Sequence, residues 1–249
     1  MIHTSGFLPM LCVRWKRVSH TMLLMFLALV ILCVSNSAQA DEMADKQASV
    51  KQMRQIGLAL QFYHDAHKHF PTAVVMGPDG KTPHSWRLEM LPYLDAKGVY
   101  DRYKMDEPWD SEHNLALVKE VADIFRMPSE QAKDDCGYFL LTGPSTPFDG
   151  EKTTTIRKII DGTSITVAIV EAKRSIPWSK PEDIPYDANQ PLPKLGGFFD
   201  DGFHVGFLDS SVVFLPNDFD EKTLRAMITH ASREPLKRPA INAPPELVK

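Results

Sequence analysis

The sequence contains few cysteines, no excess of basic residues and only a short apolar segment near its start. Three cysteines among 249 residues are too few for a disulfide-stabilised scaffold. With 28 Lys and Arg against 32 Asp and Glu, the chain lacks the basic footprint of a nucleic-acid-binding protein, so no nucleic-acid partner is expected. The apolar run at residues 22–34 is thirteen residues long, whereas a transmembrane helix needs roughly 20.

Motifs of common catalytic sites are also missing. The sequence has no HExxH zinc motif, no G-x-S-x-G nucleophile motif and no glycine-rich phosphate loop. We therefore expect no enzymatic activity and no cofactor.

The first 40 residues are typical of a secretory signal peptide. Arg14, Lys16 and Arg17 precede the apolar run, and the small-x-small sequence AQA follows it at residues 38–40. This order predicts cleavage between Ala40 and Asp41 and export to the periplasm, the cell surface or the medium. Retention of the segment as a membrane anchor is the alternative. After cleavage, no stable membrane insertion is expected.

Removal of residues 1–40 changes the character of the chain. The remaining 209 residues carry 25 basic and 32 acidic side chains, a net charge of −7, and a single cysteine, Cys136. A lone cysteine in an exported protein is either buried or paired with another chain. Burial is favoured here, because Asp134 and Asp135 would raise the pKa of the thiol and disfavour a reactive thiolate.

Hydrophobic periodicity predicts a helix over residues 45–68. Met53, Ile56, Leu60 and Tyr63 recur at three- and four-residue spacing and form an apolar face. Leu58 and Phe62 widen that face, so the helix is expected to be packed on more than one side.

The rest of the chain predicts further helices followed by strands. A helical stretch at residues 85–103 contains Pro92, which breaks or kinks it, and a helix further on can be capped by Asp110 or Ser111. Strands are expected at residues 137–142, 164–171, 203–208 and 212–215, the last two as a hairpin, and a helix at 221–231. This order indicates an α+β fold, an N-terminal helix packed on an antiparallel sheet. A single domain is expected over residues 41–232, with a proline-rich flexible tail at 233–249.

Three polar clusters are candidate sites. His64 and His67 could bind a transition metal, although histidines near a helix C-terminus also complement its dipole. Trp109 and Asp110 lie in an acidic segment that could bind a sugar or a cation together with Trp178, or could simply form a helix N-terminus. Residues 199–204, which end at His204, could form an acid/base pair or only a turn.

Several segments together resemble the bacterial family known as domain of unknown function 1559. The segments are QIGLALQFYHD at 55–65, FP at 70–71, SWR at 85–87, LPYL at 91–94, DEPWD at 106–110, HN at 113–114, IDGTS at 160–164, Glu171, PW at 177–178, KPED at 180–183, GF at 206–207 and Asp209. The resemblance implies a pilin- or pseudopilin-like body. Family members have also been labelled solute-binding, and no catalytic residue is carried over from the family.

The resemblance leaves three functional hypotheses, in decreasing order of support. The first is an exported, non-enzymatic structural or surface-interaction module, with other extracytoplasmic or cell-surface proteins as its partners. The second is a binding module for a small solute, sugar or cation. The third is a metal-dependent hydrolase that uses His64, His67 or His204. Arg14, Lys16 and Arg17 interrupt the apolar helix that prepilins use for assembly, so a cleavable signal is expected in its place.

Overall fold

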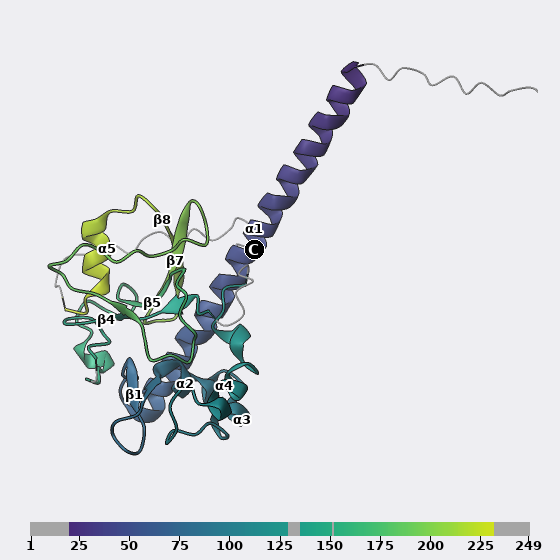
Figure 1. Ribbon diagram of the computed structural model, residues 1–249. Helices are drawn as coiled ribbons and strands as arrows, with labels where there is room; N and C mark the ends of the chain where they lie inside the picture. Colours follow the sequence, from purple (N-terminus) through teal and green to yellow (C-terminus); the bar gives the residue numbers. More distant parts are fainter. Residues whose placement is uncertain (1–19, 129–134, 151, 232–249) are drawn as a thin grey trace, which may run out of the picture. The chain divides into compact units, whose positions relative to one another are not determined.

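The computed structural model describes residues 20–128, 135–150 and 152–231. The predicted tail at 233–249 lies outside the described residues, as does Asp134. The chain divides into two compact units, Met1–Met43 and Ala44–Lys249. Helix α1, His20–His67, contributes residues to both units (Figure 1).

The first unit is described only as far as helix α1 passes through it. Ala40 and Asp41 are exposed residues within the helix, and cleavage between them stays a prediction. Within the described residues, no helix combines the length and apolar character that a membrane crossing requires.

In the second unit, helix α1 buries the face that its periodicity predicts. Met53, Ile56 and Leu60 are at most 1% exposed, and the helix ends at His67 because Lys68 adopts a positive φ of 66°. Leu58 and Phe62, however, are 44% and 54% exposed. The expectation that helix α1 is packed on more than one side is therefore wrong for the single chain.

Short helices follow where one longer helix was expected. The stretch at residues 85–103 is divided into α2 (Trp86–Met90), the 3-10 helix η1 (Leu91–Tyr93) and α3 (Lys97–Tyr100). Pro92 lies in the first turn of η1, where its missing N–H needs no partner, and Asp95 has a positive φ of 56° before α3. Ser111 caps α4 (Glu112–Val118) by accepting a hydrogen bond from the Asn114 N–H, and η2 (Ala122–Ile124) follows.

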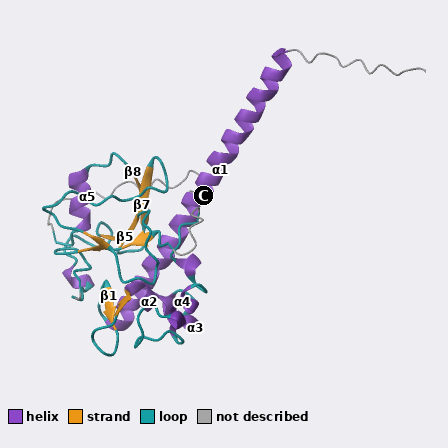
Figure 2. Cartoon of the chain, in the orientation of Figure 1, coloured by secondary structure: helices purple, strands orange, loops and turns teal. Residues whose placement is uncertain are grey.

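The main sheet is antiparallel and has the strand order β3-β5-β7-β8. Figure 2 shows the strands in orange, with β5, β7 and β8 labelled. Its strands are β3 (Tyr138–Phe139), β5 (Val167–Glu171), β7 (Gly202–Phe207) and β8 (Val212–Pro216). The predicted hairpin is confirmed. The strand predicted at 164–171 begins later, at Val167, because a turn closes from Gly162 to Ile165.

Smaller elements complete the fold. The strand predicted at 137–142 is divided into β3 and β4 (Leu141–Thr142), and β4 pairs in parallel with β6 (Ile184–Pro185). A hairpin of β1 (Val74–Met76) and β2 (Pro83–Ser85) was not predicted. The 3-10 helix η3 (Ile156–Lys158) precedes β5, and Asp220 caps α5 (Glu221–Ile228), which ends early because Thr229 is extended.

Helix α1 packs closely on the β7–β8 hairpin within the second unit. A Cβ on Gly57 would lie 2.9 Å from the Ser210 Cβ, so only glycine allows this approach. The Gln61 side chain donates to the Leu208 carbonyl at 3.1 Å. The fold is α+β, as the sequence predicts.

Candidate functional site

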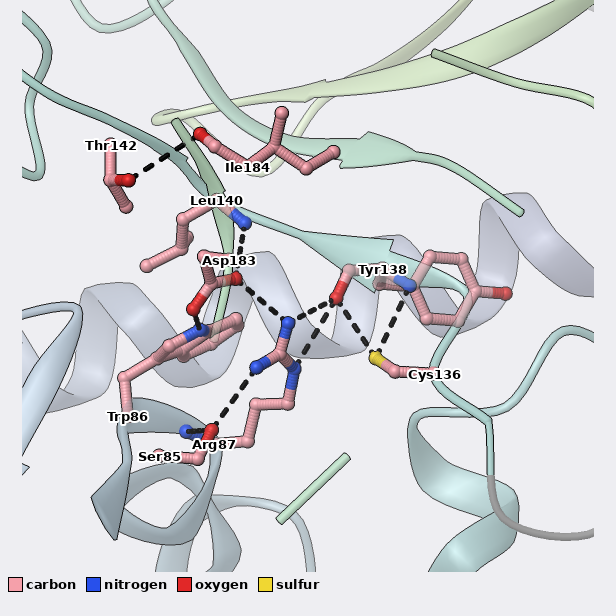
Figure 3. Close-up of polar contacts among 9 residues, drawn as sticks. All are labelled: Ser85, Trp86, Arg87, Cys136, Tyr138, Leu140, Thr142, Asp183 and Ile184. Atoms are coloured by element: carbon pink, nitrogen blue, oxygen red, sulfur yellow. Dashed lines mark hydrogen bonds and ion pairs between the residues drawn. The ribbon is translucent and has the colours of Figure 1, made fainter. Parts of the chain in front are cut away.

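A buried ion pair between Arg87 and Asp183 lies within the second unit (Figure 3). The Arg87 Nη2 is 2.8 Å from the Asp183 Oδ1, and the two side chains are 0% and 2% exposed. Arg87 belongs to α2, and Asp183 directly precedes β6. The pair therefore joins two segments almost one hundred residues apart.

Every side of this ion pair is hydrogen-bonded to the protein. Arg87 donates through Nε and Nη2 to the Tyr138 carbonyl and through Nη1 to the Ser85 hydroxyl. Asp183 accepts from the Leu140 N–H at 2.9 Å and from the Trp86 indole at 3.0 Å (Figure 3). Such full satisfaction is what a buried charge pair requires in order to be tolerated.

Electrostatic interactions keep the Arg87 side chain of this pair protonated. Burial opposes the charge of the guanidinium, but the nearby Asp183 outweighs it and the pKa of Arg87 is raised. Burial also raises the pKa of Asp183, while Arg87 and the Leu140 N–H act in the opposite direction. Arg87 is therefore a permanent buried cation with one carboxylate as its counterion.

Cys136 adjoins this cluster as a free, buried thiol. Its Sγ donates to the Tyr138 carbonyl at 3.0 Å, and burial raises the pKa of the thiol. The expected burial of Cys136 is confirmed, but burial rather than neighbouring aspartates is the main cause of the raised pKa. A protonated, hydrogen-bonded thiol is a poor nucleophile.

A second buried network surrounds the Glu171 carboxylate. Glu171 accepts hydrogen bonds from the Ser49 hydroxyl on α1 and from the His204 backbone N–H, the latter at 2.7 Å. The His204 Nδ1 lies 2.8 Å from the Glu171 Oε1. The Tyr138 hydroxyl lies 3.1 Å from the Ser49 hydroxyl and donates to Gln52 at 2.8 Å.

This second network is not a catalytic triad. In a triad the histidine lies between the serine and the acid, whereas here Ser49 and His204 both contact the carboxylate of Glu171. Ser49, Glu171 and His204 are each at most 3% exposed. The arrangement holds helix α1 against the sheet, and the Ser49 hydroxyl is directed to Glu171 instead of His204.

The structure places His64 and His67 against different neighbours. The His64 ring lies 4.8 Å from the Phe70 ring, and its Nε2 accepts from the Ile156 N–H. The His67 ring stacks on Tyr63 at 4.1 Å. In the part of the chain that the structure describes, no group of three or more His, Cys, Asp or Glu side chains converges as a metal site.

Trp109, Asp110 and Trp178 are not all available at the surface. Trp178 is 2% exposed, donates from its indole to the Val118 carbonyl at 3.2 Å and lies 5.2 Å from the Phe125 ring. Trp109 is half-buried, and Asp110 is exposed. Because a tryptophan must present a ring face to solvent in order to stack on a sugar, Trp178 is a core residue in this structure.

The acidic segment around Trp109 is organised by Asn114. The Asn114 Oδ1 accepts from the Lys104 N–H, and its Nδ2 donates to the Lys104 and Pro108 carbonyls, each at 3.0 Å. With Ser111 as the cap of α4, the segment forms the helix N-terminus that was the alternative interpretation.

The sequence analysis did not select Arg87 and Asp183 as site residues. Both occur in the segments that resemble the family, SWR at 85–87 and KPED at 180–183. A further signal was available, because Arg87 lies three and four residues before Met90 and Leu91 and so shares an apolar face with them in a predicted helix. A charged residue in an apolar face indicates a buried ion pair.

Comparison with known proteins gives one match. The model of a family described as "Protein of unknown function (DUF1559)", which is also labelled solute-binding-like, matches residues 42–146. No curated protein and no solved structure matches. The matched range includes residues 44–67 of α1, α2 with Arg87, and strands β3 and β4. Over residues 42–146, this chain is therefore similar to the DUF1559 family.

Proposed function

We propose that this protein is an exported, non-enzymatic structural module of pilin-like architecture that works by contact between polypeptide surfaces. The observation that carries the proposal is a groove of about 360 Å³ beside helix α1. Leu58 and Phe62 of α1 form one wall of the groove, and Tyr93 and Ile124 contribute to the other. Two large apolar side chains in one groove, each about half exposed, indicate an interaction surface.

The buried polar networks support a role without catalysis. Arg87, Asp183, Glu171 and His204 all direct their hydrogen bonds to other groups of the protein. Side chains whose hydrogen bonds are made within the protein stabilise the fold and do not bind or activate a substrate.

The occupant that the groove fits best is a second copy of the same chain. Leu58 and Phe62 are one helical turn apart on α1, and such a stripe is self-complementary about a two-fold axis. Lys51 and Asp65 are both exposed and lie seven residues before and after Leu58, on the same helical face. In an antiparallel pair of α1 helices centred on Leu58, Lys51 of each copy meets Asp65 of the other.

Sedimentation equilibrium of the processed chain tests this contact. The wild type is expected to form a dimer at a concentration between about 10 µM and 1 mM. Leu58→Glu and Phe62→Glu are expected to weaken dimerisation more than about tenfold, because each places a charge in an apolar interface. Ile160→Glu is the matched control, since Ile160 is 57% exposed and does not line the groove.

A charge exchange tests the antiparallel register. Lys51→Asp and Asp65→Lys are each expected to weaken dimerisation, because each places like charges opposite one another. The double variant restores the opposite charges and is expected to dimerise like the wild type. A wild type that stays monomeric up to about 1 mM, or an equal effect of Ile160→Glu, would contradict the proposal.

A further inference from the structure

A second hollow, of about 380 Å³, lies between helix α3 and the 3-10 helix η2. Its lining includes Ala96 and Val99, which are each 7% exposed. Val121 and Ile124 also line it, and both are partly buried and packed against the hydrophobic core. The hollow therefore offers an apolar floor where the core comes close to the surface.

Four charged side chains line this hollow, and three of them already belong to ion pairs. Arg102 donates through Nη1 to the Glu120 carboxylate at 3.1 Å. Asp123 forms an ion pair with Arg126. The fourth, Asp95, is exposed, and the described residues provide neither an ion pair nor a hydrogen bond for its carboxylate. Asp95 is therefore the one charged group of the lining that is available to a ligand.

This arrangement favours a singly charged cation. Because each of the two ion pairs is neutral, the charge that remains is the negative charge of Asp95. A monocation balances this charge, whereas an anion would be repelled. An ammonium group suits a carboxylate, since it carries three hydrogen-bond donors and no acceptor. An apolar group on the same molecule would cover Val99 and Ile124 and remove them from water.

We propose that this hollow binds a small organic ammonium ion that carries an apolar group. The ammonium donates a charge-assisted hydrogen bond to Asp95, and the apolar group lies against Val99 and Ile124. The hollow shares Asp95 and Ile124 with the α1 groove, but neither Leu58 nor Phe62 lines it. The inference therefore does not rest on the contact proposed for α1.

The phenethylammonium ion is a suitable probe of this site. By the volume of liquid water, about 30 Å³ per molecule, the hollow has room for roughly twelve non-hydrogen atoms, and this ion has about nine. Phenethyl alcohol has the same shape without the charge, and phenylacetate carries the opposite charge. NMR titration of the processed wild-type chain is expected to give saturable binding of the ion below about 10 mM. Phenethyl alcohol should bind at least about threefold more weakly, and phenylacetate should not bind.

Two aspartate variants locate the binding. Asp95 has a positive φ of 56°, a conformation that asparagine also tolerates, so Asp95→Asn removes the charge and keeps the fold. This variant is expected to bind the phenethylammonium ion at least about threefold more weakly. Asp106→Asn is the matched control, because Asp106 is exposed and does not line the hollow. In the wild type, the ion is expected to shift the methyl signals of Val99 and Ile124.

Three results would overturn the proposal. The first is no saturable binding of the phenethylammonium ion to the folded wild type at about 10 mM. The second is binding to Asp95→Asn as tight as to Asp106→Asn. The third is phenethyl alcohol binding as tightly as the ion. A monomeric wild type can still bind the ion, and a dimeric wild type can fail to bind it, so failure here and failure of the α1 contact are distinguishable.

Discussion

Replacement of Asp183 by asparagine would test the buried ion pair most directly. The asparagine side chain keeps one oxygen, which can still accept from the Leu140 N–H, but its NH2 group cannot accept from the Trp86 indole, so the change removes the charge and one acceptor. Arg87, which is 0% exposed, would then be a buried cation without a counterion. Loss of one partner of a buried pair typically destabilises by about 3–5 kcal/mol, so we expect the free energy of unfolding of Asp183→Asn to fall by that amount.

Replacement of the other partner, Arg87, has a different effect because the remaining carboxylate can be neutralised by a proton. Arg87→Met leaves Asp183 without its cation, and burial already raises the pKa of this carboxyl. The folded variant would take up a proton more readily than the unfolded chain, so the destabilisation is present at neutral pH and decreases as the pH falls. In Arg87→Met/Asp183→Asn no charge remains, and we expect a free energy of unfolding at least about 2 kcal/mol higher than additivity predicts.

Urea unfolding, followed by tryptophan fluorescence, gives the free energy of unfolding of the wild type, the two single variants and the double variant. Trp86 and Trp178 are buried, so their fluorescence reports the loss of the core. Glu120→Gln is the matched control. It removes the charge of an ion pair with Arg102 whose side chains are about half exposed, and its effect should be below about 1 kcal/mol. If the two single substitutions are additive within about 0.5 kcal/mol, or if Asp183→Asn resembles Glu120→Gln, the reasoning is refuted.

Four further predictions follow from single residues. Ser210→Gly should raise the free energy of unfolding by up to about 1 kcal/mol in urea titrations, because Ser210 has a positive φ of 64°; a lower value would contradict this. Burial, reinforced by Glu89, raises the pKa of Tyr63 from 10.0 to about 12, so its contribution to stability is complete below pH 10 and lost as the pH rises through 12; absorbance at 295 nm follows the ionisation. The pKa of Asp79 is lowered from 3.8 to about 2 by the N–H groups of Thr82 and Lys81 and the Thr82 hydroxyl, so its contribution is present above pH 3.8 and lost as the pH falls through 2; carbon NMR of the carboxyl measures it, and Thr82→Val should raise this pKa. N-terminal sequencing of the exported protein should begin at Asp41, and a start upstream of Ala40 would contradict signal cleavage.

Local patterns in the sequence predict the larger elements well. The periodic face of α1, the cap of α4 at Ser111 and the hairpin of β7 and β8 all depend on residues close together in the chain. The division of residues 137–142 into β3 and β4 depends instead on β6, which is more than forty residues away. A short apolar run carries no information about which strand will pair with it, so that division could not be predicted.

The candidate sites were harder to predict for the same reason. His64, His67, Trp109 and Asp110 were selected because polar groups lie close together in sequence, and the structure gives the two histidines separate neighbours. Arg87 and Asp183 form the buried pair although they are far apart in the chain. Exposure also needs the tertiary structure. Leu58 and Phe62 fit the same helical pattern as buried residues, and only the fold leaves them uncovered.

Tyr138 connects the two buried polar networks and explains why both are needed. Its carbonyl accepts from Arg87 and Cys136, and its hydroxyl joins Ser49 and Gln52 of α1. An apolar face alone would allow helix α1 to slide along the sheet at little cost, because hydrophobic contact is not directional. The hydrogen bonds from Ser49 to Glu171 and from Tyr138 to Gln52 fix one register, since a shift of one turn would leave buried polar groups unpaired. That register also sets which face of α1 stays outside, so the buried networks position Leu58 and Phe62 for the contact proposed here.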